Sequence, residues 1–409
     1  PVMQLHESYM RFCSIIRVVC FANWRVFLRN IPPLSVFLLS FWLPHQVFAQ
    51  SVNPDDDPLF NEQWWVENPD ANVNIREAWD AGYTGEGVDV AVFDTGINQH
   101  EDLQANLDDS IGIVGDGPDG EINDPFLQFA DHGTSVAGVI GAADNDTGIV
   151  GVAPNATLFD FDMGDGNASI IQTSDKYFDG TGMNTDGTFG GDPVVDVRNH
   201  SYGTVGYYFP LRPGMETAWQ AAADNNIIDV KSAGNGRVVE GGATIDGLAS
   251  ADSDDNIPTM IVVGAMDKQN TFTDFSSFGS NVMVTAPGEE IQTTLGEDEF
   301  SSTQGTSFSA PIVTGAIALA KEQVSEANAW LIKHALARTS DKIDAGDSSD
   351  VGGWVSNSAG FEFNPNYGFG KLNTKELVDA TVDAAFVTKR DPHTESTNPG
   401  VTFNGSGQS

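Results

Sequence analysis

Cysteine is nearly absent from this chain. Its 409 residues include two cysteines, Cys13 and Cys20, and both lie near the N-terminus. No disulfide can therefore cross-link the rest of the chain, and no cysteine is available there as a nucleophile. Because 40% of the residues are hydrophobic and 10% aromatic, the chain can bury a large core. An exported protein of this kind is held together by that core, with bound metal ions as a further source of stability.

Basic residues are also scarce. Only 19 Lys and Arg stand against 58 Asp and Glu, which gives a formal net charge of -39. Such a surface repels the phosphates of nucleic acids and anionic membranes, so neither is expected as a partner. It favours Ca²⁺, cationic substrates or solubility in salty water, and a solvated acidic shell accounts for most of the charge.

Long apolar runs are missing, apart from LSVFLLSFWL at residues 34–43. This run is too short to span a bilayer comfortably. Arg25 and Arg29 precede it and the sequence VFA follows, ending at Ala49, which is typical of a signal peptide and its cleavage site. We therefore expect a leader at residues 1–49, although a buried N-terminal helix is the alternative. After removal of the leader the protein is expected to be secreted or periplasmic, with no membrane association.

Strand-like and helix-like segments alternate along the rest of the chain. Buried strands are expected at 88–94, 156–163, 194–203, 227–235 and 259–266, and helices at 132–143, 215–226, 307–324 and 327–340. This alternation predicts a mainly parallel sheet with helices on both faces. The sequence indicates one large domain at 50–380, followed at 381–409 by a polar tail or by a linker that is truncated before a further domain.

Three short runs carry residues suited to nucleophilic catalysis. Asp94 ends a strand in VFDTGI, His132 opens a helix in DHGTSVAG, and Ser307 opens a helix in GTSFSAP. A serine hydroxyl needs an adjacent base, which imidazole supplies, and a carboxylate fixes the tautomer of that imidazole. Each run alone has a simpler explanation, because a helix-opening serine is usually an N-cap and Asp-Thr-Gly is usually a turn. The three together, in this order, favour catalysis.

A fourth run, SAGNG, places Asn235 in a turn flanked by glycines. A neutral amide donor aimed at a developing oxyanion stabilises the transition state. The N–H groups at the helix start around Ser307 favour an anion in the same way.

The runs DTG, HGTSVAG, SAGNG and GTSFSAP, in this order and spacing, resemble the subtilase family of serine peptidases. The resemblance spans about residues 55–380. It implies a three-layer α/β fold with a mainly parallel central sheet, and a serine endopeptidase acting on protein or peptide substrates as a monomer. The segments 57–65, 78–88 and 366–378 are similar to the kexin-like convertase branch, whose members carry a further domain after the catalytic one.

The resemblance also implies a structural Ca²⁺ held by the loop GAADNDTGIVGVAP at 141–154. By the family pattern Asp57 and Asp102 supply carboxylates and Asn145 a side-chain oxygen, while backbone carbonyls come from Ala143, Thr147 and Ile149. Hard cations take oxygen ligands of these kinds. Without calcium, the polar residues of this loop would form an ordinary turn.

Two kinds of substrate pocket are compatible with the sequence. Asp246 matches one acidic position of the convertase pocket, and Asn199 is a candidate for orienting substrate, with a strand-end turn as its alternative role. Tyr207, Tyr208 and Phe209 follow NHSYG where the convertase pattern has acidic residues. An acidic pocket for basic side chains and an apolar pocket therefore both stay open.

Two other functions compete with the peptidase. One is a catalytically silent secreted binding protein with the subtilase fold, although such a protein would not need all four runs. The other is an esterase, which typically shows a Gly-x-Ser-x-Gly elbow and another order of the catalytic residues. Neither feature surrounds Ser307.

Overall fold

The computed structural model describes residues 52–108, 130–162, 188–189, 192–193, 195–202, 222–236, 259–344, 346, 353–356 and 360–385. They all belong to one compact unit, Gln50–Ser409. The expected leader at 1–49, most of the expected tail at 381–409 and the pocket residues Asp246, Tyr207, Tyr208 and Phe209 lie outside the described residues.

A six-stranded sheet forms the centre of the described fold. Its strands are β1 (Asp89–Asp94), β2 (Thr157–Asp162), β5 (Val197–His200), β6 (Ile228–Ser232), β7 (Ile261–Met266) and β8 (Val282–Pro287). They lie in the order β2-β1-β5-β6-β7-β8, and all neighbouring strands are parallel. The strands are buried almost without interruption, as expected when both faces of a parallel sheet are covered.

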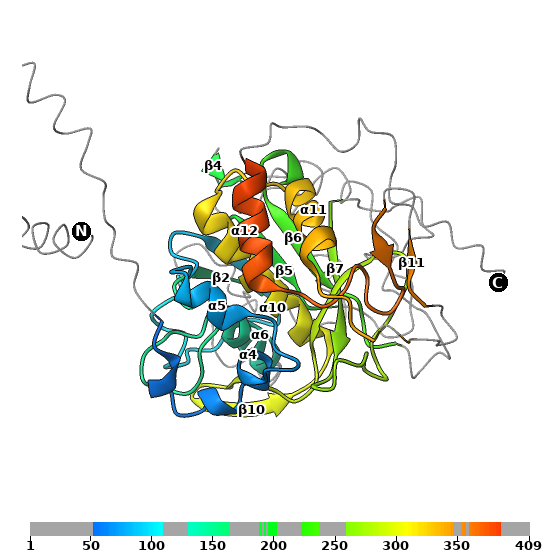
Figure 1. Ribbon diagram of the computed structural model, residues 1–409. Coiled ribbons are helices and arrows are strands. Elements are labelled where there is room, and N and C mark those ends of the chain that lie inside the picture. Colours follow the sequence, from blue (N-terminus) through cyan, green and yellow to red (C-terminus); the bar gives the residue numbers. More distant parts are fainter. Residues whose placement is uncertain are drawn as a thin grey trace, which may run out of the picture. The chain divides into compact units, whose positions relative to one another are not determined.

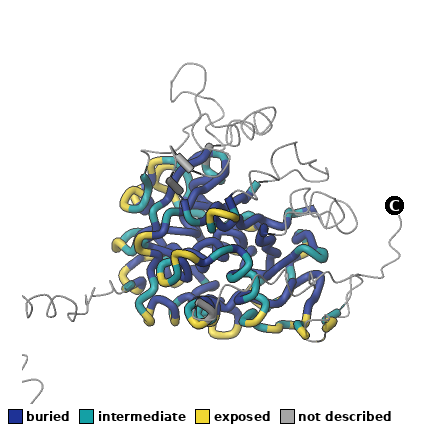
Figure 2. Tube along the Cα trace, turned by 90° about the horizontal axis from the view of Figure 1, so that it is seen from above, coloured by how far each residue is buried: buried dark blue, intermediate teal, exposed yellow. Residues whose placement is uncertain are grey.

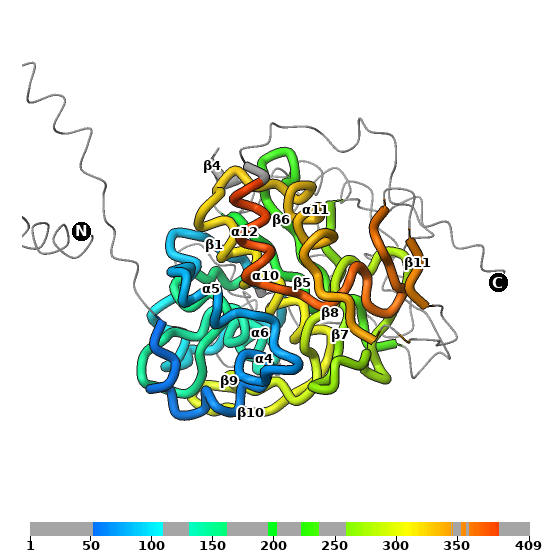
Figure 3. The backbone as a smooth tube through the Cα atoms, in the orientation of Figure 1, coloured from blue at the N-terminus to red at the C-terminus, as the bar shows by residue number. Residues whose placement is uncertain are grey.

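Two long helices cross one face of the sheet. The helix α6 (Ala130–Gly141) packs on β1, and α10 (Thr306–Gln323) packs on α6 and on β5 to β8 (Figures 1 and 3). Outside them lie α5 (Ile75–Asp80), α11 (Ala329–Thr339) and α12 (Thr374–Ala385), with α12 in contact with α5, α10 and α11. The helix α10 is buried along most of its length, and Figure 2 shows buried residues gathered in the interior with exposed ones at the rim.

Short elements complete the described part of the chain. Near its start lie two 3-10 helices, η1 (Pro54–Asp56) and η2 (Phe60–Glu62), and α4 (Trp64–Glu67). Three antiparallel hairpins pair β3 (Thr188–Phe189) with β4 (Asp192–Pro193), β9 (Ile291–Leu295) with β10 (Glu299–Thr303), and β11 (Val355–Ser356) with β12 (Glu362–Phe363). Among the described residues, no helix is long and apolar enough to cross a membrane.

The two faces of the sheet differ in their packing. On the side of α6 and α10, Val90, Val92, Val197 and Val230 join a large apolar core that includes the helices. On the other side, Ala91 and Phe93 belong to a smaller cluster with aromatic residues of β2 and with Ala222 and Ile227. Successive strand residues point to opposite faces, so the same strands contribute to both clusters.

The parallel sheet predicted from the alternating segments is confirmed. All five expected strands and three of the four expected helices are present, and each begins and ends within three residues of its predicted bounds. The expected helix at 215–226 lies largely outside the described residues. The strand β8 and the hairpin β9–β10 were not predicted. The helix α12 continues past residue 380, where the sequence placed the end of the domain, to Ala385.

The topology fixes where a ligand would bind. The strand β1 has β2 on one side and β5 on the other, so the strand order changes direction there. In open α/β sheets, ligands bind outside the carboxyl ends of the strands at such a switch point. Asp94 is the last residue of β1, and Ser201 follows the last residue of β5.

Candidate active site

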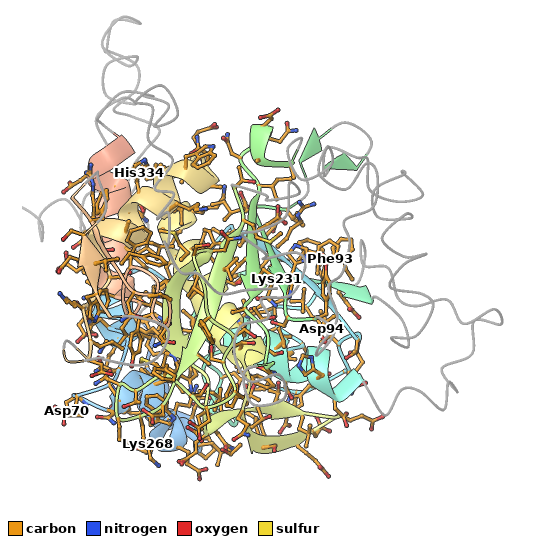
Figure 4. The ribbon with its side chains drawn as sticks, turned by 90° about the vertical axis from the view of Figure 1, so that its right-hand side faces the viewer. Asp70, Phe93, Asp94, Lys231, Lys268 and His334 are labelled. Carbon is orange, nitrogen blue, oxygen red and sulfur yellow. The ribbon has the colours of Figure 1, made fainter. Side chains whose placement is uncertain are left out.

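Asp94 and His132 are brought together at this edge. The Nδ1 atom of His132 lies 2.6 Å from Oδ1 of Asp94, and the carboxylate is 2% exposed. The backbone N–H of Thr95 donates to the same oxygen at 2.8 Å. Asp94 is thereby fixed at the strand end, where Figure 4 shows it beside Phe93. A short contact of this kind between ring nitrogen and carboxylate leaves the other ring nitrogen as the one that can accept a proton.

Small residues allow this approach of α6 to β1. A Cβ atom on Gly133 would lie 2.2 Å from the carbonyl oxygen of Gly96, so glycine is needed after His132. The N–H of Gly133 donates to Oγ1 of Thr95 at 3.1 Å. The motifs DTG and HGT therefore fit each other directly, and this fit sets the position of the His132 ring.

The hairpin β9–β10 fixes the start of α6 from the other side. The hydroxyl of Thr294 donates to the carbonyl of Thr134 at 2.7 Å, and that of Thr293 to the carbonyl of Ser135 at 2.6 Å. The hydroxyl of Ser135 donates in return to the carbonyl of Thr294 at 2.6 Å. Three buried hydrogen bonds thus tie the helix that carries His132 to strand β9.

Ser307 lies in the first turn of α10. Gly305 precedes the helix with φ 145°, a conformation that favours glycine. The hydroxyl of Ser307 donates to the carbonyl of Ser201 at 3.0 Å, and the hydroxyl of Ser201 donates to the carbonyl of Ser307 at 2.9 Å. Among the described residues, the Ser307 hydroxyl is therefore bonded to Ser201 and not to the ring of His132. The next residue, Phe308, places its ring 5.5 Å from the ring of His132.

The amide of Asn235 is oriented by the same turn of α10. Its Oδ1 atom accepts from the backbone N–H and the hydroxyl of Thr306, at 3.0 and 2.9 Å. The hydroxyl of Thr306 in turn accepts from the N–H of Gly234 at 3.1 Å. With its oxygen occupied, Asn235 presents its NH₂ group as a donor next to the first turn of α10, which adjoins Ser307.

The environment of His132 alters its basicity. Burial acts to lower the pKa of the imidazole, but the charge of Asp94 and the hydrogen bond to it outweigh burial and raise the pKa above 6.5. The ring therefore becomes a stronger base than a free histidine, which suits proton abstraction near neutral pH.

The residues expected to bind calcium lie together around the loop after α6. Oδ1 of Asp57 accepts from the N–H of Thr147 at 2.9 Å, and Oδ2 of Asp102 accepts from the N–H of Ile149 at 3.1 Å. The side-chain oxygen of Asn145 also accepts from Thr147, at 2.9 Å. The N–H of Ala143 donates to the carbonyl of Asp102 at 2.9 Å.

The two carboxylates fit a cation. Oδ2 of Asp57 and Oδ1 of Asp102 are buried and have no hydrogen-bond partner. Burial raises the pKa of Asp57 to about 7 and that of Asp102 to about 8, with repulsion from Asp144 adding to the first and repulsion from Asp57 to the second. Buried oxygens of this kind are satisfied by a hard cation. Among the described residues no group of three or more His, Cys, Asp or Glu side chains could hold a metal, so the remaining ligands would be amide and carbonyl oxygens.

The pocket candidate Asn199 lies inside the molecule. It is fully buried, donates to the hydroxyl of Ser201 at 2.9 Å, and accepts from the hydroxyl of Thr314 at 2.9 Å. It therefore joins β5 to α10 and supports Ser201. The sequence alone assigned no role to Ser201, although its place in the run NHSYG after a buried strand was the available signal.

Comparison with known proteins identifies the family. The model of the subtilase family matches residues 85–370, well over half of the chain. An alkaline protease of Alkalihalobacillus alcalophilus is 30% identical over 305 residues, which cover 72% of this chain and 70% of that protein. A dibasic-processing endoprotease of Schizosaccharomyces pombe is 29% identical over 347 residues, which cover 80% of this chain and 46% of that protein. The kexin-like branch is thus one of several that the chain resembles.

The fold has solved counterparts. A serine protease of Aeromonas sobria, in a complex with the chaperone ORF2, superposes with a TM-score of 0.64 at 22% identity, covering 80% of this chain and 67% of that one. A protease of Pseudoalteromonas arctica superposes with a TM-score of 0.58 at 24% identity, covering 80% of this chain and 99% of that one. At these identities the likeness shows the three-layer α/β fold alone. Taken with the family match and the protease relatives, it means that the chain belongs to the subtilase family and is a serine endopeptidase.

Proposed function

We propose that the chain hydrolyses peptide bonds with Ser307 as nucleophile, His132 as general base and acid, and Asp94 as the group that orients His132. The observation that carries this proposal is the 2.6 Å contact between His132 and Asp94 at the sheet edge where the first turn of α10 holds Ser307. In the resting arrangement the Ser307 hydroxyl is bonded to Ser201. Rotation about its Cα–Cβ bond frees it to donate to the imidazole when substrate binds.

The reaction follows in two stages. Ser307 Oγ attacks the scissile carbonyl carbon while His132 takes its proton, which forms a tetrahedral oxyanion. The amide of Asn235 and the N–H of Ser307 at the start of α10 donate to that oxyanion. His132 then passes the proton to the leaving amine and the peptide C–N bond breaks, leaving an ester on Ser307. Water, deprotonated by His132, hydrolyses this ester and restores the serine.

A structural calcium ion is the second part of the proposal. Asp57, Asp102 and Asn145 would supply side-chain oxygens, and the carbonyls of Ala143, Thr147 and Ile149 would complete the set. The orphaned carboxylate oxygens of Asp57 and Asp102 support this assignment. When bound, the ion neutralises two buried charges and joins the segment around η1 to the loop after α6. It takes no part in the reaction.

The remaining assignments concern the whole protein. We propose a leader at residues 1–49, a catalytic domain that begins at residue 50 and a monomeric secreted or periplasmic enzyme. One relative, from Xanthomonas campestris, is an extracellular protease, which supports export. The relatives include both alkaline proteases and a dibasic-processing endoprotease, so cleavage-site profiling on a peptide library decides between an apolar and an acidic pocket.

A fluorophosphonate probe tests the catalytic proposal. Wild type should be labelled and should degrade casein, whereas Ser307→Ala should do neither while it keeps the melting temperature of wild type. Ser309→Ala, two residues further along the same helix, is the matched control and should keep both activities. A folded wild type that the probe leaves unlabelled would favour a silent binding protein. Turnover of lipid esters without casein degradation would favour an esterase.

A further inference from the structure

Charged residues occupy a buried face of the central sheet. On β5 and β6, Arg198 lies opposite Asp229 and His200 lies opposite Lys231. All four residues are at most 3% exposed. Interior strands of parallel sheets are normally apolar on both faces, so a buried group of four ionisable residues needs a reason. It lies on the face opposite α10, with Phe93 stacked 5.0 Å from the ring of His200.

Part of this group is a compact ionic network. The guanidinium of Arg198 donates to both oxygens of Asp229, at 2.7 and 2.8 Å, and Nε2 of His200 lies 2.8 Å from Oδ1 of the same carboxylate. Asp229 is therefore satisfied without Lys231. Fork-like pairing of this kind compensates the desolvation of both ions and fixes their geometry.

Lys231 instead binds two stretches of backbone. Its ammonium donates to the carbonyl of Tyr202 in a short hydrogen bond, and to the carbonyl and hydroxyl of Ser232 at 3.2 and 3.3 Å. It also lies 5.4 Å from the centre of the Tyr202 ring, whose hydroxyl is 3.1 Å from Nδ1 of His200. Figure 4 shows Lys231 in the sheet, in the region of Phe93 and Asp94.

These two stretches are the ones that hold the nucleophile. Tyr202 directly follows Ser201, whose carbonyl accepts from the Ser307 hydroxyl. Ser232 leads to Gly234 and Asn235, which bond to Thr306. The ladder between β5 and β6 ends at His200 and Lys231, so regular pairing no longer joins the two stretches beyond that point. The ammonium of Lys231 connects them where the ladder stops.

We propose that Lys231 is a positioning residue for the peptidase reaction: its buried ammonium holds the segments Ser201–Tyr202 and Ser232–Asn235 at the spacing that places Ser307 and the oxyanion donor. The inference rests on the proposed function of Ser307 and Asn235. A buried ammonium that donates to carbonyls of both segments is rigid, because moving either segment leaves a donor or acceptor unsatisfied in a dry site.

A second buried lysine provides a matched control. Lys321, near the end of α10, is 2% exposed and donates to the carbonyls of Asn226, Ser325 and Ala327, at 2.9, 3.0 and 3.2 Å. It lies fourteen residues along α10 from Ser307, about 20 Å at the rise of an α-helix. Replacing either lysine by methionine removes a buried ammonium and its carbonyl contacts, and at Lys321 it also removes an ion pair of 3.4 Å with Asp196. Only Lys231 adjoins the site.

The experiment compares Lys231→Met with Lys321→Met, each measured for Tm and, per folded molecule, for kcat and KM on a peptide substrate. Both variants should lose stability. Lys231→Met should lower kcat at least tenfold with KM within about twofold of wild type, because the reacting groups are displaced by fractions of an ångström. Lys321→Met should keep the kcat of wild type. Equal kcat in both variants, or an unchanged kcat in Lys231→Met, would overturn the proposal.

A milder variant covers the case in which Lys231→Met does not fold. Ser232→Ala keeps the ammonium but removes the hydroxyl that accepts from Lys231 and donates to the carbonyl of His200. It should lower kcat several-fold with a smaller loss of Tm than Lys231→Met, and a kcat equal to that of wild type would overturn the proposal. Wild type and Ser307→Ala are measured alongside, so that failure of the peptidase assignment is recognised separately from failure of the role of Lys231.

Discussion

The fit between Gly133 and Gly96 gives the most direct test of how the fold positions the base. In Gly133→Ala the new Cβ would lie 2.2 Å from the carbonyl oxygen of Gly96, 3.0 Å from its carbonyl carbon and 3.2 Å from Cβ of Asp94. The backbone atoms cannot rotate away, so α6 and the turn after β1 must separate by roughly 1 Å to reach ordinary contact distance.

The same displacement acts on the His132 ring, which precedes the mutated position. A contact of 2.6 Å to Asp94 would lengthen to about 3.6 Å, beyond hydrogen-bond range. Overpacking of this kind costs about 1–3 kcal/mol of stability, and a misplacement near 1 Å in an active site costs about 100-fold in rate. We expect a lower Tm and a kcat/KM reduced on the order of 100-fold.

Gly141→Ala is the control, at the other end of the same helix. Its Cβ would meet side-chain atoms of Leu158 at 3.2 and 3.3 Å and the carbonyl oxygen of Ala153 at 3.3 Å, so small shifts suffice. Any helix propensity gained by replacing glycine is common to both variants. Peptide hydrolysis and thermal unfolding are measured for both. If Gly133→Ala keeps the kcat/KM of wild type, or if Gly141→Ala loses as much, the steric argument is wrong.

Four further outcomes are expected. Asp94→Asn should lower kcat by about 10⁴ without loss of fold, because the amide stabilises the wrong tautomer of the imidazole; progress curves together with near-UV circular dichroism measure this. Asn235→Ala should lower kcat about 10²–10³-fold with little change in KM in steady-state assays. Removal of the asparagine oxyanion donor causes a loss of this size in a subtilisin, a member of the same family. Because Asp94 raises the pKa of His132 above 6.5 and the base must be neutral to act, kcat/KM should rise with pH to a half-maximum above 6.5, as a pH–rate profile would reveal. Removal of calcium with EDTA should lower the Tm of wild type. Asp102→Ala should have a low Tm that EDTA no longer changes. Identical melting curves of wild type with and without EDTA would contradict the calcium site.

Much of the architecture is readable in the sequence because a buried parallel strand is a nearly continuous apolar run. The segments that became β1 and β7 have this form, and the small residues around His132 predict a helix that approaches its neighbours closely. Strand β8, VMVTAP, is as long as β1 and β7 and also apolar, but turn residues enclose it, so its register against β7 depends on contacts distant in sequence. Strand β9 is buried but polar, strand β10 is mostly exposed or half-buried, and only their pairing identifies the hairpin.

Some residues of the candidate site can be identified from the sequence, and others only from the structure. Asp94, His132, Ser307 and Asn235 each stand in a run whose neighbours serve the same chemistry, so the sequence alone singles them out. Ser201 and Lys231 do not, because a serine after a strand and a lysine within one have no chemical meaning until their partners are known. Asn199 illustrates the converse: its side chain is suited to binding substrate, yet tertiary packing directs it toward Thr314.

The three hydrogen bonds between β9 and the start of α6 have a consequence for local unfolding. The chain runs from β9 through the short strand β10 directly into α10. One continuous segment therefore forms the hydrogen bonds to the helix that carries His132 and also contains Ser307. Amide protons of 132–139 and 291–307 should therefore exchange with solvent as one cooperative unit. Local unfolding of that unit would displace His132 and Ser307 together. The enzyme would then not populate a partly unfolded state in which only one of the two residues is in place.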